Sequence, residues 1–177
     1  MGISDFNKLK SIIANFKNAK ILVLGDLILD EFIWGDVSRI SPEAPVPVVW
    51  VKRESFMPGG ASNVANNLSS LGACTYLVGV IGSDERGAIL KGELEQKNID
   101  VSGIVVDPSR PTTLKTRVVA HHQQVVRIDK ETVGGLSDDL IRRIINNTKK
   151  LIDKMDAVII EDYGKGVITP KLLKEIV

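Results

Sequence analysis

The sequence predicts an α/β protein built around a mostly parallel β-sheet, and two observations carry that prediction. Short, wholly apolar runs recur along the chain at 21–24, 76–81 and 157–160. Such runs are typical of strands that are buried on both faces. Between them lie segments whose apolar residues repeat at helical spacing. Strands that alternate with helices in this way form parallel sheets covered by helices.

Composition and charge indicate an ordinary globular protein. The chain has 177 residues, of which 44% are hydrophobic and 25% charged, enough for one sizeable core. A net charge of +1 gives the chain no strong overall electrostatic attraction to nucleic acid or to a membrane surface. The N-terminus lacks the apolar core of a signal peptide, and no later segment reaches the length of a membrane span. We therefore expect a cytoplasmic protein with no nucleic-acid or membrane partner.

The first half of the chain contains two predicted helices and one buried strand. Apolar residues at helical spacing predict the first helix: Phe6, Leu9, Ile12, Ile13 and Phe16. The strand at 21–24 ends in Gly25-Asp26. Pro58-Gly59-Gly60 then opens a second helix, and Gly72 stands where a C-terminal cap is expected. Its apolar stripe consists of Ala61, Val64, Ala65, Leu68 and Leu71.

The second half continues the alternation. After the strand at 76–81, Gly82-Ser83-Asp84 begins a helix that runs to about Lys97, and a short strand follows at 104–106. Ser137 precedes a further helix, as an N-terminal cap would. The strand at 157–160 ends in Glu161-Asp162. Thr169-Pro170 is typical of the start of another helix.

Two segments break this alternation, residues 32–53 and residues 112–129. Both are rich in Val, Thr, Trp and Ile, and both resemble antiparallel hairpins, the second turning near His121-His122. They predict a small antiparallel sheet that stands off the main body as a lid. Within the first, the run SRISPEAPVPVV contains prolines that exclude the middle of a sheet and favour an edge strand.

A ligand site is expected beyond the carboxyl ends of the parallel strands, where Gly25-Asp26 and Glu161-Asp162 lie. In PGGASNVANNL, Gly59 and Gly60 let the backbone approach a ligand, and the helix that follows presents free amides. The amide of Asn63 can both donate to and accept from a sugar hydroxyl. A glycine-rich loop without any ligand is the alternative. No metal site is predicted, because adjacent residues such as His121 and His122 point to opposite faces of a strand.

These motifs carry a family resemblance. GGASNVANNLSSLGACTYLVGVIG and the GxDxxG-like residues 82–87 resemble the ribokinase (PfkB-type) carbohydrate kinases. GDLILDEFIWGDVSRISPEAPVPVV and TRVVAHHQQVVRID resemble, within that family, the heptose-7-phosphate kinases of lipopolysaccharide-core biosynthesis. The resemblance implies a three-layer ribokinase-like sandwich with a lid. It also implies ATP-dependent phosphorylation of the anomeric hydroxyl of heptose 7-phosphate, giving heptose 1,7-bisphosphate for ADP-heptose synthesis.

The same resemblance implies roles for particular residues. The residues expected to bind the sugar are Asp26, Asp30, Gly59, Gly60 and Asn63. The cations expected at the phosphate of the substrate are Lys115, Arg117 and Arg127, of which Lys115 and Arg117 share one strand face. In EDYGKG, Asp162 and Lys165 are expected near the path of the transferred phosphoryl group.

The sequence lacks the GAGD motif that supplies the catalytic base in this family. We therefore expect residues 1–177 to form the N-terminal, sugar-binding portion of one kinase domain, with no catalytic residue and without the ATP-binding part. ATP and Mg²⁺ would serve the full-length enzyme, and neither would bind this portion tightly. A homodimer through the lid is expected. The alternatives are another ribokinase-type sugar or nucleoside kinase, and a freestanding sugar-phosphate-binding or dimerisation module without catalysis.

Overall fold

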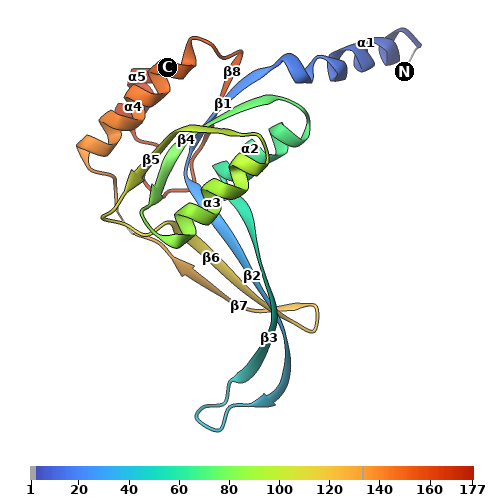
Figure 1. Cartoon of the computed structure of the whole chain (residues 1–177), viewed down its shortest axis with the longest axis vertical. Helices are drawn as coiled ribbons and strands as arrows, with labels where there is room; N and C mark the ends of the chain where they lie inside the picture. The colour runs from blue at the N-terminus through green and yellow to red at the C-terminus, as the bar shows by residue number, and fades with distance from the viewer. Residues whose placement is uncertain (1–2, 133) are drawn as a thin grey trace.

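The computed structural model describes residues 3–132 and 134–177, which form a helix-covered body and a second sheet that extends from it (Figure 1). The body contains a parallel four-stranded sheet in the order β5-β4-β1-β8. Its strands are β1 (Lys20–Gly25), β4 (Cys74–Gly82), β5 (Asp100–Asp107) and β8 (Ala157–Glu161).

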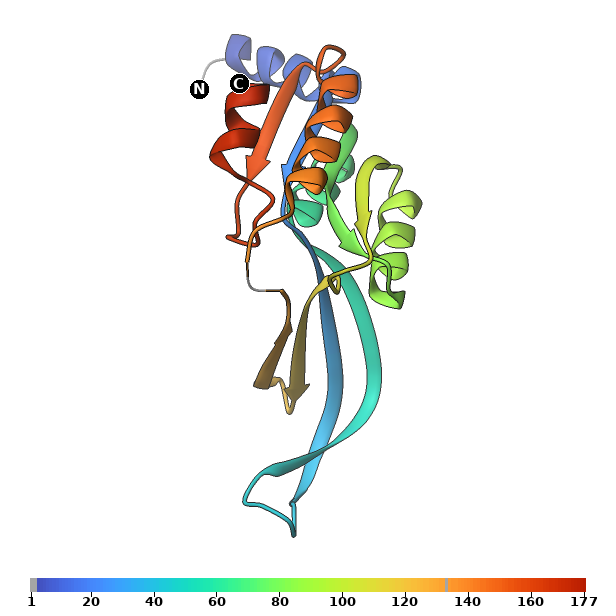
Figure 2. The ribbon, with the colours of Figure 1, turned by 90° about the vertical axis from the view of Figure 1, so that its left-hand side faces the viewer.

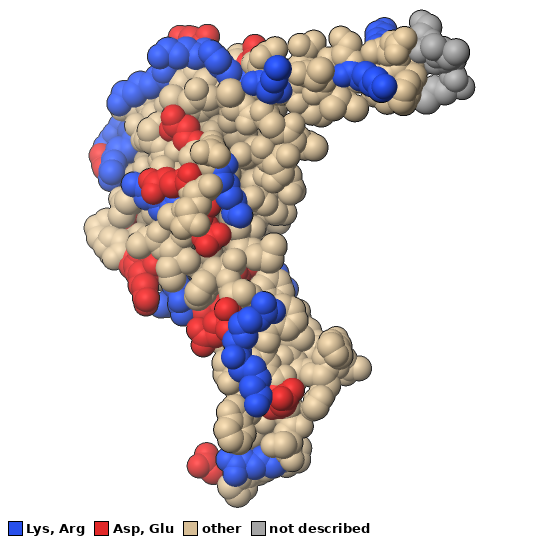
Figure 3. Space-filling view, turned by 45° about the vertical axis from the view of Figure 1, so that its right-hand side comes forward, with Lys and Arg blue, Asp and Glu red and all other residues tan. Residues whose placement is uncertain are grey.

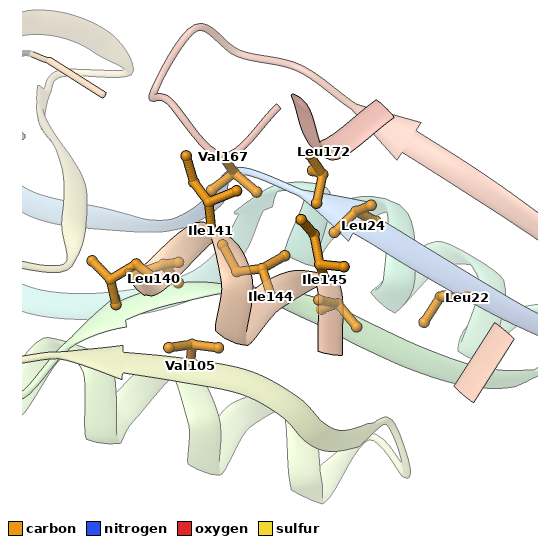
Figure 4. Packing of buried hydrophobic residues seen from close by; sticks show 11 residues of the cluster. Leu22, Leu24, Val105, Leu140, Ile141, Ile144, Ile145, Val167 and Leu172 are labelled. Carbon is orange, nitrogen blue, oxygen red and sulfur yellow. The ribbon is translucent and has the colours of Figure 1, made fainter. Parts of the chain in front are cut away.

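Helices cover both faces of this sheet. Two hydrophobic clusters, one on each face, hold them: one involves α2 (Ala61–Ser70) and α3 (Glu85–Gln96), the other α4 (Asp138–Ile152) and α5 (Pro170–Ile176). Alternate residues of β1 serve the two clusters, since Val23 belongs to the first and Leu24 to the second. Figure 4 shows the α4 side chains, including Ile144, directed at the sheet. The predicted three-layer α/β fold is confirmed.

The predicted helix starts are also confirmed. Ser137 and Thr169 cap α4 and α5, each accepting a hydrogen bond from the backbone amide three residues farther on. Such caps are worth about 1 kcal/mol each, because they satisfy amides that have no partner within the helix.

The second sheet has the order β3-β2-β6-β7, and we call these strands the lid (Figure 2). They are β2 (Leu27–Ile40), β3 (Pro47–Gly60), β6 (Thr113–Ala120) and β7 (Gln123–Lys130). Each predicted hairpin is antiparallel, but β2 pairs with β6 in parallel, so the lid is mixed rather than wholly antiparallel. The reason is topological: β2 continues from β1, and β6 follows β5, which runs parallel to β1. Both strands therefore leave the body in the same direction.

The first hairpin is longer than predicted, because β2 begins directly after β1 and β3 runs straight into α2. Pro42 and Pro45 lie in the connection between the two strands, and Pro47 begins β3. β3 is an edge strand, as the prolines predicted. The second hairpin turns at His121 and His122, both of which have positive φ.

Two short helical segments precede the body, α1 (Ile3–Ala14) and the 3₁₀ helix η1 (Phe16–Asn18). The first was predicted from its apolar spacing. Its apolar residues are nevertheless exposed, and the helix projects away from the sheets in Figure 1. The exposed side chains are Phe6, Leu9, Ile12 and Ile13.

Candidate functional site

Asp26 directly follows β1 and is almost fully buried. Both oxygens of its carboxylate accept hydrogen bonds of 2.8 to 3.2 Å from backbone amides in the segment after β8, those of Tyr163, Lys165 and Val167. Its carbonyl oxygen accepts a further bond from the amide of Ala61, at the start of α2. Asp26 therefore joins three segments at the carboxyl edge of the body sheet, and protein amides occupy its carboxylate.

Asp30 lies on β2 at the base of the lid, and 22% of its side chain is exposed. Its carboxylate pairs with the guanidinium of Arg117 on the neighbouring β6. It also lies against Gly59, where an added Cβ atom would approach Asp30 Oδ2 to 2.6 Å. The glycine thus leaves the space that this carboxylate occupies. Part of the Asp30 side chain nevertheless remains exposed.

The end of β3 brings the backbone close to both aspartates. Gly60 has a φ of +54°, in the left-handed region, and a Cβ atom there would lie 2.6 Å from the carbonyl oxygen of Asp26. α2 begins without a side-chain cap, and Asn63 in its first turn is exposed. Four of the predicted sugar-binding residues therefore lie where β2, β3 and α2 meet: Asp30, Gly59, Gly60 and Asn63.

The three predicted phosphate-binding cations all have carboxylate partners. Arg117 pairs with Asp30, whereas Lys115 and Arg127 both pair with Asp129 on β7, at 3.0 and 2.9 Å. The hydrogen bond from Lys115, supported by that from Arg127 and opposed by burial, holds the pKa of Asp129 below its ordinary value. Figure 3 shows basic side chains with acidic ones beside them along the lid. The sequence analysis missed Asp129, although the register of a hairpin places it opposite Lys115.

The EDYGKG segment after β8 is held in place by its own contacts as well as by Asp26. Asp162 accepts a hydrogen bond from the amide of Gly164 at 2.8 Å. Lys165 forms an ion pair with Glu131, which follows β7 and which the sequence analysis also missed. Arg110 donates to the carbonyl oxygen of Lys165. The two predicted phosphoryl-path residues thus lie in one ordered loop beside the carboxyl edge of the body sheet.

Asp84, in the GxDxxG-like segment, accepts hydrogen bonds from neighbouring protein groups. Its carboxylate caps α3 by accepting from the amide of Gly87, and it accepts two further hydrogen bonds from the amide and hydroxyl of Thr112. Burial would raise the pKa of Asp84, but the hydrogen bonds from Thr112 and Gly87 outweigh burial and lower it. Since β6 begins at Thr113, Asp84 attaches the second hairpin of the lid to the body.

An ion pair with a buried carboxylate attaches the other hairpin. Glu31 of β2 is 5% exposed and pairs with Arg86 of α3 at 2.8 Å. The hydroxyl of Thr116 donates to the same carboxylate, and the Arg86 guanidinium lies over the ring of Phe56. The sequence analysis did not single out these residues, because the contact joins segments that are far apart in the chain. It fixes the base of the lid against α3.

The residues described by the structure include no group of three or more His, Cys, Asp or Glu side chains arranged to hold a metal ion. None of the described helices is both long enough and apolar enough to cross a membrane.

Comparisons with known proteins agree with this arrangement. The family model described as pfkB family carbohydrate kinase matches residues 18–176. The "Bifunctional protein HldE" of Geobacter sulfurreducens is 48% identical over 168 residues, which are 95% of this chain and 34% of the relative. HldE of Helicobacter pylori strain J99 is 49% identical over 158 residues, 89% of this chain and 34% of the relative. The chain thus spans about a third of the length of these curated relatives.

Solved structures show the same fold at lower identity. Phosphofructokinase-2 from Escherichia coli superposes with a TM-score of 0.66 at 19% identity, covering 89% of this chain and 49% of the other. A carbohydrate kinase from Agrobacterium tumefaciens gives a TM-score of 0.61 at 21% identity, covering 80% and 45%. The family match over residues 18–176, the HldE relatives and the shared fold lead to one conclusion: the chain belongs to the pfkB family of carbohydrate kinases.

Proposed function

We propose that the chain is the sugar-binding portion of an ATP-dependent kinase that phosphorylates heptose 7-phosphate at its anomeric hydroxyl. The similarity to HldE along nearly the whole chain supports this substrate. One structural observation supports the proposed function most directly. The partly exposed carboxylate of Asp30 lies against the backbone at Gly59 and beside the guanidinium of Arg117. A carboxylate suits sugar hydroxyls and a guanidinium suits a phosphate, and both are present within one small site.

Within this site we assign hydroxyl binding to Asp30, with Gly59, Gly60 and Asn63 contributing backbone access and an amide. Asp26 contributes by holding the loop after β8, because its carboxylate already accepts three amides. Arg117 would bind the phosphate, and Lys115 and Arg127 would add positive charge at the same face. Asp162 and Lys165 would lie along the path of the phosphoryl group.

ATP would supply that phosphoryl group and Mg²⁺ would offset its charge, since phosphoryl transfer depends on positioning and electrostatic stabilisation. The described residues include no cluster of three or more carboxylates, histidines or cysteines that could hold the metal. We expect the 177-residue chain alone to lack kinase activity, because it contains neither a GAGD base nor the rest of the nucleotide site. Since ATP is available in the cytoplasm, we place the reaction there.

Calorimetric titration of the chain with heptose 7-phosphate tests the substrate. We expect binding that weakens for the same heptose without its phosphate. Asp30→Asn and Asn63→Ala should each reduce affinity, whereas Asp36→Asn should not, because Asp36 is an exposed lid carboxylate that pairs with Lys52. Tighter binding of ribose, fructose or a nucleoside than of heptose 7-phosphate would contradict the proposal and favour another ribokinase-type kinase.

We also propose that two copies associate through the lid. Its tip exposes several large apolar side chains, and Trp50 is 69% exposed. A hollow of about 700 Å³ lies beside them, lined by Ser38, Arg39, Val48, Val49, Trp50 and Val51. The outer strand β7 is exposed along its whole length, apolar residues included. Exposed apolar surface of this kind is typical of a protein–protein interface.

A further inference from the structure

Beyond Asp30, the lid face that carries it presents two aromatic rings and two arginines, which we call the aromatic–arginine row: Phe32, Trp34, Arg53 and Arg117. The rings of Phe32 and Trp34 stack with their centroids 5.7 Å apart. The guanidinium of Arg117 lies 5.4 Å from the centroid of Phe32, and that of Arg53 lies 5.1 Å from the centroid of Trp34.

The strand register places the row on the same face as Asp30. Asp30, Phe32 and Trp34 are alternate residues of β2, so their side chains share one face. Arg117 lies opposite Phe32 on β6, and Arg53 lies opposite Trp34 on β3. At about 3.3 Å per residue, Arg117 is roughly 7 Å along the strand from Asp30 and Arg53 roughly 13 Å. A ligand that extends outward from Asp30 therefore meets Arg117 first and Arg53 next.

The two arginines differ in charge balance. Arg117 is neutralised by Asp30, whereas no salt bridge within the described part of the chain involves Arg53, whose side chain is exposed. Between the levels of Asp30 and Trp34 on this face, four cations stand against two carboxylates, which leaves an excess of positive charge. The cations are Arg53, Lys115, Arg117 and Arg127, and the carboxylates are Asp30 and Asp129.

The position of the Arg53 guanidinium is held by its neighbours. The indole of Trp34 is fixed by a hydrogen bond from Nε1 to the hydroxyl of Ser55 at 3.0 Å and by its stacking on Phe32. A guanidinium over an indole is attracted by the negative face of the ring. An arginine held in this way loses less conformational entropy when it binds an anion.

We propose that Arg53, positioned by Trp34, is a specificity-determining residue that binds the phosphate at the far end of the sugar. This inference rests on the proposed function and deepens it: the outer position of Arg53 favours a phosphate on the seventh carbon over one on the sixth. Arg117, which lies between Asp30 and Arg53 along the strand, then binds the same phosphate from its inner side, as proposed above.

Affinities measured by calorimetry for the 177-residue chain test this proposal, with heptose 7-phosphate, mannose 6-phosphate and unphosphorylated heptose as ligands. Arg53→Ala should weaken heptose 7-phosphate binding about tenfold, as expected for the loss of a charged hydrogen bond. It should weaken mannose 6-phosphate less and leave unphosphorylated heptose unchanged, and Arg53→Lys should restore part of the loss. The matched control is Lys52→Ala, which removes an equal charge from the next residue of β3, where the lysine pairs with Asp36 instead of lying over Trp34.

The fluorescence of Trp34 reports directly on a ligand that binds beside Arg53. The chain has two tryptophans, so Trp50→Phe leaves Trp34 as the only indole emitter. Titration of this variant with heptose 7-phosphate should change the Trp34 fluorescence, and Arg53→Ala should remove that change. If the unmodified chain binds heptose 7-phosphate and Arg53→Ala behaves like Lys52→Ala, this inference is wrong and the proposed function stands. If the unmodified chain binds no sugar phosphate, the proposed function fails, and this inference with it.

Discussion

Asp26 and Asp30 lie close together in the sequence, yet the fold surrounds them differently. Asp26 is buried and accepts hydrogen bonds from three backbone amides, whereas Asp30 is partly exposed and faces Arg117 and Gly59. Both were predicted to bind the sugar. Asp26 holds the loop after β8, and Asp30 keeps part of its side chain exposed; sugar binding by either residue stays a prediction.

Asparagine substitutions separate these two roles. Asp26→Asn replaces one acceptor oxygen by a donor that faces amide donors, so unfolding free energy should fall by roughly 2 kcal/mol or more. Asp30→Asn should cost at most about 1 kcal/mol, because its partner is a partly exposed ion pair, but it should weaken heptose 7-phosphate binding. Urea unfolding and calorimetric titration of both variants measure the two effects. Equal losses of stability would contradict the division of roles.

Asp84 predicts a pH dependence of stability. Its pKa in the folded protein lies below the ordinary value of 3.8, so its ionised form stabilises the fold at any pH above that value. The contribution is lost as the pH falls through the lowered pKa. Asp84→Ala should therefore cost about 1 to 2 kcal/mol at neutral pH, and the difference from the unmodified chain should shrink below pH 3.8.

Urea unfolding at several pH values measures this difference. Asp139→Ala is the control, because Asp139 is an exposed carboxylate in the first turn of α4 that pairs with Arg142. A stability difference for Asp84→Ala that persists unchanged in acid would show that the ionised carboxylate is not its source.

At the scale of elements, the lid is attached at its base and free at its tip. Glu31 and Arg86 join β2 to α3, and Asp84 and Thr112 join the start of β6 to the same helix. Farther out, the β6–β7 hairpin turns through His121 and His122 with φ of 49° and 64°. Two positive φ values are typical of a two-residue type I′ turn, which favours Asn-Gly rather than histidines.

Substitutions at this turn should therefore be able to raise or lower the unfolding free energy. His122→Gly should raise the unfolding free energy by about 0.5 kcal/mol, because glycine adopts positive φ without strain. His122→Val should lower it by about 1 kcal/mol or more, because a β-branched residue is disfavoured there. Urea unfolding measures both, and equal stabilities would mean that this turn is not strained.

At the scale of the whole molecule, the body buries its apolar residues on both faces of one sheet, whereas the lid leaves apolar residues exposed. A partner that covers the lid would therefore remove this exposed apolar surface from water. A dimer through the lid would also cover the open edges of a sheet, which otherwise favour aggregation.

Sedimentation analysis tests this association. The 19.3 kDa chain should sediment as a dimer, and Trp50→Glu should shift it toward monomer by placing a charge in the hollow at the lid tip. Leu71→Glu is the control, because Leu71 is 62% exposed on the body, at the end of α2. A monomeric unmodified chain, or an equal effect of Leu71→Glu, would contradict a lid-mediated dimer.

The sequence by itself determined the elements whose causes are local. Apolar runs such as 21–24 predicted strands buried on both faces, although the run at 157–160 forms the partly exposed edge strand β8. Ser137 and Thr169 marked helix starts, and the prolines of SRISPEAPVPVV predicted an edge strand. Its motifs were also sufficient to predict the family, which the comparisons confirm.

Tertiary structure decided what depends on segments far apart in the chain. The parallel pairing of β2 with β6, the amides around Asp26 and the partners of Lys115 and Arg127 all arise from such contacts. Periodicity reports which face a side chain shares, but it does not report which strand lies beside it. For that reason the sequence identified the candidate carboxylates and cations, and only the fold distinguished the buried carboxylate held by amides from the partly exposed one.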